Sequence, residues 1–240
     1  MDTFPPALPH GDLEEIFPDV FVVTGSMQTV LMGAHWHFSR NMTVVRSGEE
    51  LTLINTVRLD DAGLARLESL GKVTHVVRIG SLHGRDDAFY KQRYGATFWA
   101  LPGMPMPEGL QPDKLISADE GAERPFPDAR FFVFQSTKLP ESLVLVERAG
   151  GVLVACDALQ NWLAPDAFFS DESRTMMAEM GFFQEANFGP VFLQVSEPKR
   201  EDYTRLLALD FRHALCGHGS PLRDKAREAY TARCEQVFGR

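Results

Sequence analysis

The chain has 240 residues, 44% of them hydrophobic and 24% charged, which is enough for one large globular domain with a substantial core. Its formal net charge of −9 opposes phosphate backbones and anionic membrane surfaces, so we expect neither nucleic acid nor a membrane as a partner. The longest apolar stretches, such as residues 20–23 and 152–156, are far shorter than the roughly 20 residues of a membrane-spanning helix.

The start of the chain and its cysteines indicate a compartment. Residues 1–6 lack the basic and apolar regions of a secretory signal. The three cysteines, Cys156, Cys216 and Cys234, are widely separated and form no C-x-x-C pair, so we interpret them as buried thiols. We therefore expect a cytoplasmic protein without a disulfide framework.

The first half of the chain predicts a hairpin followed by a parallel crossover. Asp60 can cap a helix that Gly71 ends, and the polar segment 81–87 follows the next strand. A strand, a helix and a strand of this length predict a crossover with this polar segment at the carboxyl end of the second strand, where α/β proteins place their chemistry. The predicted strands, all short and rich in β-branched residues, are 20–24, 42–45, 51–54 and 73–79.

The second half predicts more strands and then helices. Residues 101–112 are rich in proline and glycine and form either a lid or a simple connection. Residues 149–151, Ala-Gly-Gly, indicate a hairpin. The order of elements predicts two similar halves of mixed sheet and helix. The predicted strands are 131–134, 143–146, 152–156 and 211–216, and the predicted helices are 173–180, 200–209 and 222–238.

Two imidazoles and two carboxylates lie at the ends of predicted strands. His83 and Asp87 share one loop, Asp157 follows the strand that ends at Cys156, and His218 lies between two glycines. Loops at one edge of a layered sheet converge, and this set of side chains suits zinc, iron or manganese. Each residue alone also has a simpler interpretation, since a glycine-flanked histidine can form a turn and an aspartate can cap a helix.

In combination, these segments resemble the metallo-β-lactamase superfamily over roughly residues 20–221. The resemblance implies an α+β fold, an αββα sandwich of two mixed β-sheets flanked by helices, formed by a single metallo-β-lactamase-like domain over residues 1–240. In that family a H-x-H-x-D-H segment, a later histidine, an aspartate or cysteine at a strand end and a final histidine, often in G-H-G, hold one or two metals. The segments that carry the resemblance are 41–45, 51–56, 73–77, 156–157 and 216–219.

The first motif is incomplete in this sequence. His83 matches its first histidine and Asp87 its aspartate, whereas Arg85 and Ala88 replace its other two histidines. A competing register would place His83 on the second histidine, Arg85 on the aspartate and Asp86 on the final histidine. We prefer the first register because it preserves Asp87.

The later histidine is also replaced. Residues 137–142 are similar to the family's G-H-T-P-G-S segment, and Lys138 occupies the histidine position. The family holds its first metal with three histidines, and Arg85 and Lys138 would stand for two of them. Two permanent positive charges in that cavity would repel a divalent ion. The resemblance therefore implies at most one metal, with the candidate ligands His83, Asp87, Asp157 and His218.

A cluster of ion pairs without metal is the alternative. A buried carboxylate without a metal needs a positive partner, so we expect Arg85 or Lys138 to contact Asp157 or Asp87. In that case Lys138→Ala should destabilise the fold by about 3 kcal/mol, and replacing both cations by histidine should raise metal affinity.

Two readings of function follow from the resemblance. The first is a metal-dependent hydrolase with at most one zinc, iron or manganese ion, in which Asp87 and Asp157 are the catalytic carboxylates and water attacks an ester, amide or phosphoester of an unknown small molecule. The second is a non-catalytic ligand-binding or interaction protein that has lost its metal centre, with Arg85 and Lys138 binding an anionic group. A homo-oligomer is compatible with both.

Two further groups have structural and functional interpretations. His35 and His37 share one face if their segment is extended and could line a pocket, but a polar edge strand is the simpler interpretation. An apolar cluster is most simply core, and is also compatible with a dimer face or an apolar substrate wall. Its members are Met176, Met177, Met180, Phe182 and Phe183.

Overall fold

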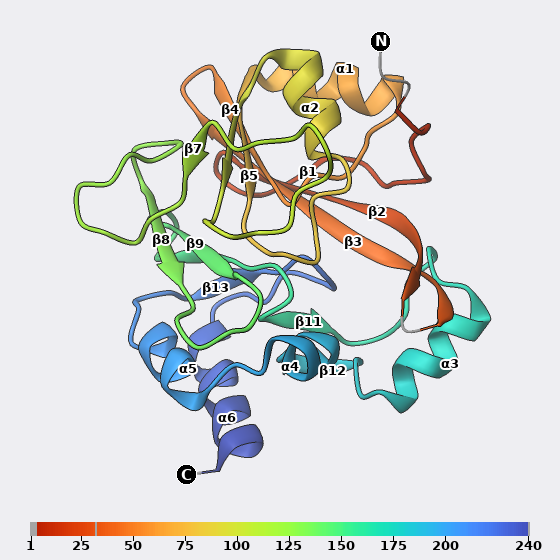
Figure 1. Cartoon of the computed structure of the whole chain (residues 1–240), viewed down its shortest axis with the longest axis vertical. Helices are drawn as coiled ribbons and strands as arrows, with labels where there is room; N and C mark the ends of the chain where they lie inside the picture. The colour runs from red at the N-terminus through yellow and green to blue at the C-terminus, as the bar shows by residue number, and fades with distance from the viewer. Residues whose placement is uncertain (1–3, 32, 240) are drawn as a thin grey trace.

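Two large mixed β-sheets pack face to face in the computed structural model, which describes residues 4–31 and 33–239 (Figure 1). The first sheet contains β1 Glu14–Phe17, β2 Val20–Leu31, β3 Ala34–Ser47, β4 Glu50–Ile54, β5 Lys72–Arg78, β6 Thr97–Ala100 and β7 Lys114–Leu115, in that order. The second contains β13 His213–Leu215, β10 Val152–Val154, β9 Ser142–Val146 and β8 Ala129–Val133, in that order, and a separate pair consists of β11 Gln160–Trp162 and β12 Gln184–Asn187.

Helices cover the outer faces of the sandwich. In Figure 1, α1 Asp61–Leu70 and α2 Asp87–Tyr94 lie beyond the first sheet, and α4 Pro190–Ser196, α5 Arg200–Leu207 and α6 Ala226–Phe238 lie beyond the second. The remaining helix, α3 Asp171–Glu179, lies near the tip of the β2–β3 hairpin. Within the described residues, no helix is long and apolar enough to cross a membrane.

The predicted crossover is confirmed. β3 and β4 pair antiparallel as a hairpin, and β4 and β5 pair parallel on either side of α1. The side chain of Asp60 caps α1 by accepting a hydrogen bond of 2.8 Å from the backbone N–H of Gly63. The β9–β10 hairpin is also formed, with these two strands antiparallel across residues 149–151.

Alternation along the strands of the second sheet divides the core into two layers. On β9, Val144 and Val146 pack in the cluster between the two sheets, whereas Leu143 and Leu145 pack against the outer helices. A strand with both faces covered in this way reads as a continuous apolar run, as residues 143–146 do. The layers are therefore helix, sheet, sheet and helix, which confirms the predicted αββα sandwich.

The hairpin of β2 and β3 is much longer than the sequence predicts. The two strands pair continuously from Val20↔Val45 to Leu31↔Ala34, where the prediction stopped at residue 24 and began again at residue 42. Between these positions polar residues such as Gln28, His37 and Ser39 interrupt the apolar run, so the segment lacks the signal of a core strand.

Three loops meet at one edge of the sandwich. The backbone N–H of Ser142 donates to the carbonyl of Ile79, which joins the end of β5 to the second sheet. The N–H of Gly217 donates to the carbonyl of Ala155, so the segments after β10 and β13 run side by side. The N–H of Asn41 donates to the carbonyl of Gly217 and brings the long hairpin against the same edge.

Candidate metal centre

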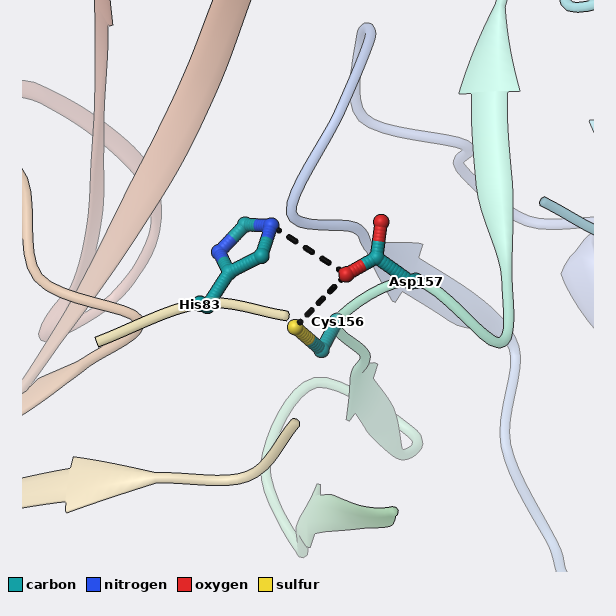
Figure 2. Close-up of side chains that lie close together, drawn as sticks. All are labelled: His83, Cys156 and Asp157. Atoms are coloured by element: carbon teal, nitrogen blue, oxygen red, sulfur yellow. Dashed lines mark hydrogen bonds and ion pairs between the residues drawn. The ribbon is translucent and has the colours of Figure 1, made fainter. Parts of the chain in front are cut away.

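His83, Asp157 and His218 come together from these three loops. Nε2 of His83 lies 3.1 Å from Nε2 of His218 and 3.4 Å from Oδ2 of Asp157. Nε2 of His218 lies 3.3 Å from Oδ1 of Asp157. Figure 2 shows the ring of His83 directed at the Asp157 carboxylate. All three side chains are nearly buried, so the three polar groups face one another and not bulk water.

Two contacts fix the orientation of the His218 ring. Nδ1 lies 2.9 Å from the backbone carbonyl of Ser39, and because a carbonyl can only accept, Nδ1 carries the proton. The indole of Trp162 stacks on the imidazole with centroids 5.0 Å apart and planes 16° apart. In a neutral ring Nε2 is therefore a lone pair aimed at the centre, the arrangement that metal-ligating histidines use.

The spacing of the three groups fits one small divalent ion. Ligands bound tetrahedrally at the usual zinc distances lie about 3.3 Å from one another, close to the three separations observed here. Without a shared cation, the His218 Nε2 lone pair and the Asp157 carboxylate are two acceptors facing each other. The donor types and their spacing thus make this cluster a possible metal site.

The protonation states agree with this assignment. Burial lowers the pKa of His83 to about 3, so at neutral pH its imidazole is uncharged, as a metal ligand requires. Burial alone would raise the pKa of Asp157, but the adjacent His83 and His218 outweigh it and lower that pKa below its usual value. Asp157 is therefore an ionised carboxylate. The buried Nδ1 of His83 has no hydrogen-bond partner among the residues that the structure describes.

Cys156 is an additional possible metal donor beside the site, which the sequence analysis interpreted only as a buried thiol. Its Sγ lies 3.4 Å from Oδ2 of Asp157, and donor atoms of His83, Cys156 and Asp157 all lie within 4.8 Å of one another (Figure 2). The thiol is fully buried, and burial together with the charges of Asp157 and Glu141 raises its pKa well above the usual value. Its burial is as predicted, and its place beside the site follows from the strand that also carries Asp157.

Glu141 holds the backbone at Asp157 in place, and the sequence analysis did not identify it. Its Oε1 accepts hydrogen bonds of 3.1 Å from the backbone N–H groups of Asp157 and Ala158. Burial and the nearby Asp157 charge raise the pKa of this carboxyl well above its usual value. Glu141 therefore holds the backbone that presents Asp157.

Asp87 takes no part in the contacts that join His83, Asp157 and His218. It begins α2 and is fully buried, with Oδ1 accepting a hydrogen bond of 2.6 Å from the Thr56 hydroxyl. Its Oδ2 is buried and has no hydrogen-bond partner within residues 4–31 and 33–239, and burial raises the pKa of the carboxyl. The structure brings together three of the four predicted ligand residues.

The expectation that Arg85 or Lys138 contacts a site carboxylate is wrong. Arg85 is exposed, and its Nη1 reaches away to the hairpin, 2.6 Å from the carbonyl of Gln28. The Lys138 backbone N–H donates to the carbonyl of Ser196 at the end of α4, and its ammonium pairs with Glu197 at 2.5 Å. Both cations are therefore exposed and are held by groups other than the site carboxylates.

Two other arginines supply the buried positive charge. Arg40 projects from β3, pairs with Asp86 and donates to the carbonyl of Thr56 at 3.0 Å. Asp86 stands at the start of α2 without capping it, since its carboxylate is used by Arg40. Buried carboxylates therefore do have cations nearby, but these are Arg40 and Arg78 instead of the expected Arg85 and Lys138.

Arg78, the last residue of β5, is the second buried cation. Its guanidinium donates to the carbonyls of Gly80 at 3.3 Å, Ser81 at 2.8 Å and Pro105 at 2.8 Å. Its charge also acts on the buried Asp87 carboxyl. Arg78 thus holds the start of the loop that carries His83. A charged residue at the inner end of an apolar strand was the available sequence signal.

Lys138→Ala should leave the free energy of unfolding unchanged within about 0.5 kcal/mol, because exposed ion pairs contribute little. The Lys138 side chain is 62% exposed and that of its partner Glu197 is 59% exposed. Urea denaturation of the variant and the unmodified protein measures the difference. A loss near 3 kcal/mol would instead mean that Lys138 pairs with a buried carboxylate, as the sequence analysis expected.

A cavity of about 140 Å³ lies against the three groups. His83, Asp157 and His218 form part of its wall, and exposed Leu82 and Arg85 line it where it reaches the surface. The predicted apolar cluster is core, as the simpler interpretation has it, because Met177 and Phe182 are buried and the other members pack against them; these two side chains also line the cavity. Trp36 lines it as well, whereas its neighbours His35 and His37 do not.

Comparisons with known proteins identify the fold. No family model matches the sequence, and no curated protein matches it. Among solved structures, a metallo-β-lactamase from Erythrobacter litoralis is similar with a TM-score of 0.58 and 13% identity, covering 94% of this chain and 92% of that one. A metallo-β-lactamase from Hirschia baltica gives 0.59 and 12%, covering 93% and 97%. The mono-zinc form of FIM-1 from Pseudomonas aeruginosa gives 0.56 and 13%, covering 97% and 98%. The chain therefore has the metallo-β-lactamase fold that its sequence segments predict.

Proposed function

We propose that the chain binds one divalent metal ion through His83, Asp157 and His218, and that it is a metal-dependent hydrolase of a small molecule. The observation that carries the proposal is the close approach of three side chains: the Nε2 atoms of His83 and His218 lie 3.1 Å apart, and a different carboxylate oxygen of Asp157 lies within 3.4 Å of each of them. A protein of the same fold, FIM-1, is known in a mono-zinc form, which supports a single ion on this scaffold. Two neighbouring arginines, Arg40 and Arg78, disfavour a second ion.

The roles of the chain's own groups follow from their contacts. A bound divalent ion would supply Lewis acidity and lower the pKa of a water molecule. The Ser39 carbonyl and the Trp162 ring hold His218 in the ligating tautomer. Glu141 fixes the backbone of Asp157, and the apolar wall of the cavity excludes bulk water from the reacting group.

His218, not Cys156, is the third ligand in this proposal. Both residues lie near the pair of His83 and Asp157, so the geometry offers two donor sets. Ligation by Cys156 requires its thiolate, which would place another negative charge beside Asp157 and Glu141 in a buried site. His218 needs no such charge, because its lone pair already points at the centre.

Metal titration of protein freed of metal by a chelator tests the site. We expect one equivalent of zinc per chain, with His218→Ala lowering the affinity by more than the roughly 10- to 100-fold that follows loss of an outer partner of a ligand. His35→Ala is the matched control, since His35 is an exposed histidine outside the cavity lining, and it should bind zinc normally.

Cobalt spectra separate the two donor sets. With His218 as ligand, the cobalt-loaded protein should show no sulfur-to-metal charge-transfer band, and Cys156→Ser should leave its spectrum unchanged. A charge-transfer band that Cys156→Ser removes would assign the third position to sulfur. Failure to bind zinc or cobalt at all would refute the metal centre and favour the non-catalytic ligand-binding alternative.

A further inference from the structure

The β2–β3 hairpin presents a regular apolar face to the cavity beside the metal centre. Side chains alternate across a strand, so every second residue of each strand lies on this face. The pairs Met27↔Phe38 and Thr29↔Trp36 are directly opposite each other and line the cavity. One wall is therefore built from a rigid two-stranded ribbon, and not from a flexible loop.

The opposite wall comes from the second half of the chain. Trp162 on β11, Phe182 before β12 and Val191 on α4 line it together with Met177 on α3. The rings interlock across the space: Trp36 and Phe182 have centroids 6.0 Å apart, and Phe38 and Trp162 have centroids 6.2 Å apart. These edge contacts join the two walls of this slot, and His218 is one of its lining residues.

The size of this slot limits how much of an occupant it can enclose. At about 140 Å³, it is close to the roughly 150 Å³ apolar cavity that is known to accept benzene. A single six-membered ring fills such a space, whereas a fused pair of rings exceeds it. The charged groups of the lining besides Asp157 and the histidines are Arg40 and Arg85, which disfavour a cationic occupant.

We propose that the site takes small esters or amides whose acyl part is one aromatic ring, or a branched alkyl group of the same size, attached directly to the reacting carbonyl. The position of the reacting carbonyl rests on the proposed function, whereas the size of the ring is inferred from the slot alone. The ring occupies the cavity that residues of the hairpin face and Trp162 line, and the carbonyl faces His83, Asp157 and His218. Hydrolysis of such a molecule adds water across the acyl bond and releases an arenecarboxylate and an alcohol or amine.

The product carboxylates are the probes. Acetate, benzoate and 2-naphthoate are titrated into zinc-loaded and metal-free protein, and binding is measured by calorimetry and by ligand-observed NMR. Benzoate should bind at least about tenfold more tightly than acetate, because the slot buries its ring, and 2-naphthoate should lose this gain. Benzylamine should not bind measurably.

A substitution on the hairpin tests the location. Thr29→Phe places a ring in the slot from a partly exposed strand position and should lower benzoate affinity at least about tenfold while acetate and zinc binding persist. Val30→Phe is the matched control, because Val30 is the next residue, is 63% exposed and lies outside the cavity lining. It should bind benzoate as the unmodified protein does.

The outcomes separate this inference from the proposed function. Zinc binding with equal affinity for all three carboxylates, or Thr29→Phe without effect on benzoate, would overturn the ring-sized acyl site and leave the metal centre standing. Selective benzoate binding by a protein that binds no zinc would refute the metal centre and retain the ring-binding slot.

Discussion

Gly219→Ala is expected to destabilise the protein by more than about 3 kcal/mol and to abolish zinc binding at the proposed centre. Gly219 adopts φ +83°, and a Cβ there would overlap the backbone carbonyl of Asn161 and lie 2.7 Å from the N of Trp162. Backbone atoms cannot turn aside as a flexible side chain can, so the loop itself must move. That loop carries His218, whose Nε2 lies 3.1 Å from that of His83.

The control variant Gly121→Ala measures the cost of a left-handed backbone without the steric collision that a Cβ meets at Gly219. Gly121 has nearly the same φ, +84°, and open space around the position of a Cβ. This variant should cost only the about 1–2 kcal/mol of a left-handed alanine and should bind zinc normally. Urea denaturation and zinc titration of both variants give the comparison. Equal losses of stability would mean that the collision at Gly219 is relieved without displacing His218.

The core of the fold is predictable from the sequence because its strands have both faces buried. Residues 143–146 are a continuous apolar run, and residues 51–54 are apolar except for Thr52; each forms a strand that pairs with its predicted hairpin partner. The outer part of the β2–β3 hairpin has no such signal, since one face lines a cavity and the other is partly solvated. Tertiary packing against α3, including the Ser173 hydroxyl that accepts from the N–H of His37, defines that part.

The convergence of His83, Asp157 and His218 is predictable for a topological reason. Each follows a strand of the sandwich, and the strand ends meet at one edge. Asp87 is four residues beyond His83, where the chain has already turned into α2, and its carboxylate faces Thr56. The direction of a side chain within a loop depends on tertiary contacts that residue spacing does not contain.

The need for buried positive charge was predictable from the sequence, but the residues that supply it were not. Buried carboxylates require nearby cations, and the sequence order favoured Arg85 because it stands inside the motif. The end of β5 points the preceding arginine, Arg78, inward instead, and the loop turns Arg85 toward the hairpin.

Arg78→Met is expected to lower the free energy of unfolding by about 3–5 kcal/mol. The substitution keeps an unbranched apolar stem, shorter than that of arginine, and removes the donors to the carbonyls of Gly80, Ser81 and Pro105, which are then left without that partner. It also removes the positive charge that acts on the buried Asp87 carboxyl. Because the Gly80 and Ser81 carbonyls belong to the loop that leads to His83, zinc affinity should fall together with stability.

Arg85→Met is the matched control for this prediction. Arg85 lies seven positions further along the same segment, is exposed and makes one hydrogen bond to a carbonyl, that of Gln28 at 2.6 Å. Its loss should cost less than about 1 kcal/mol, since water can replace the donor, and zinc affinity should not fall. Denaturation midpoints and zinc titrations of the two variants, measured side by side, test the difference. If Arg78→Met were no more destabilising than Arg85→Met, the buried guanidinium would not be what holds the His83 loop in place.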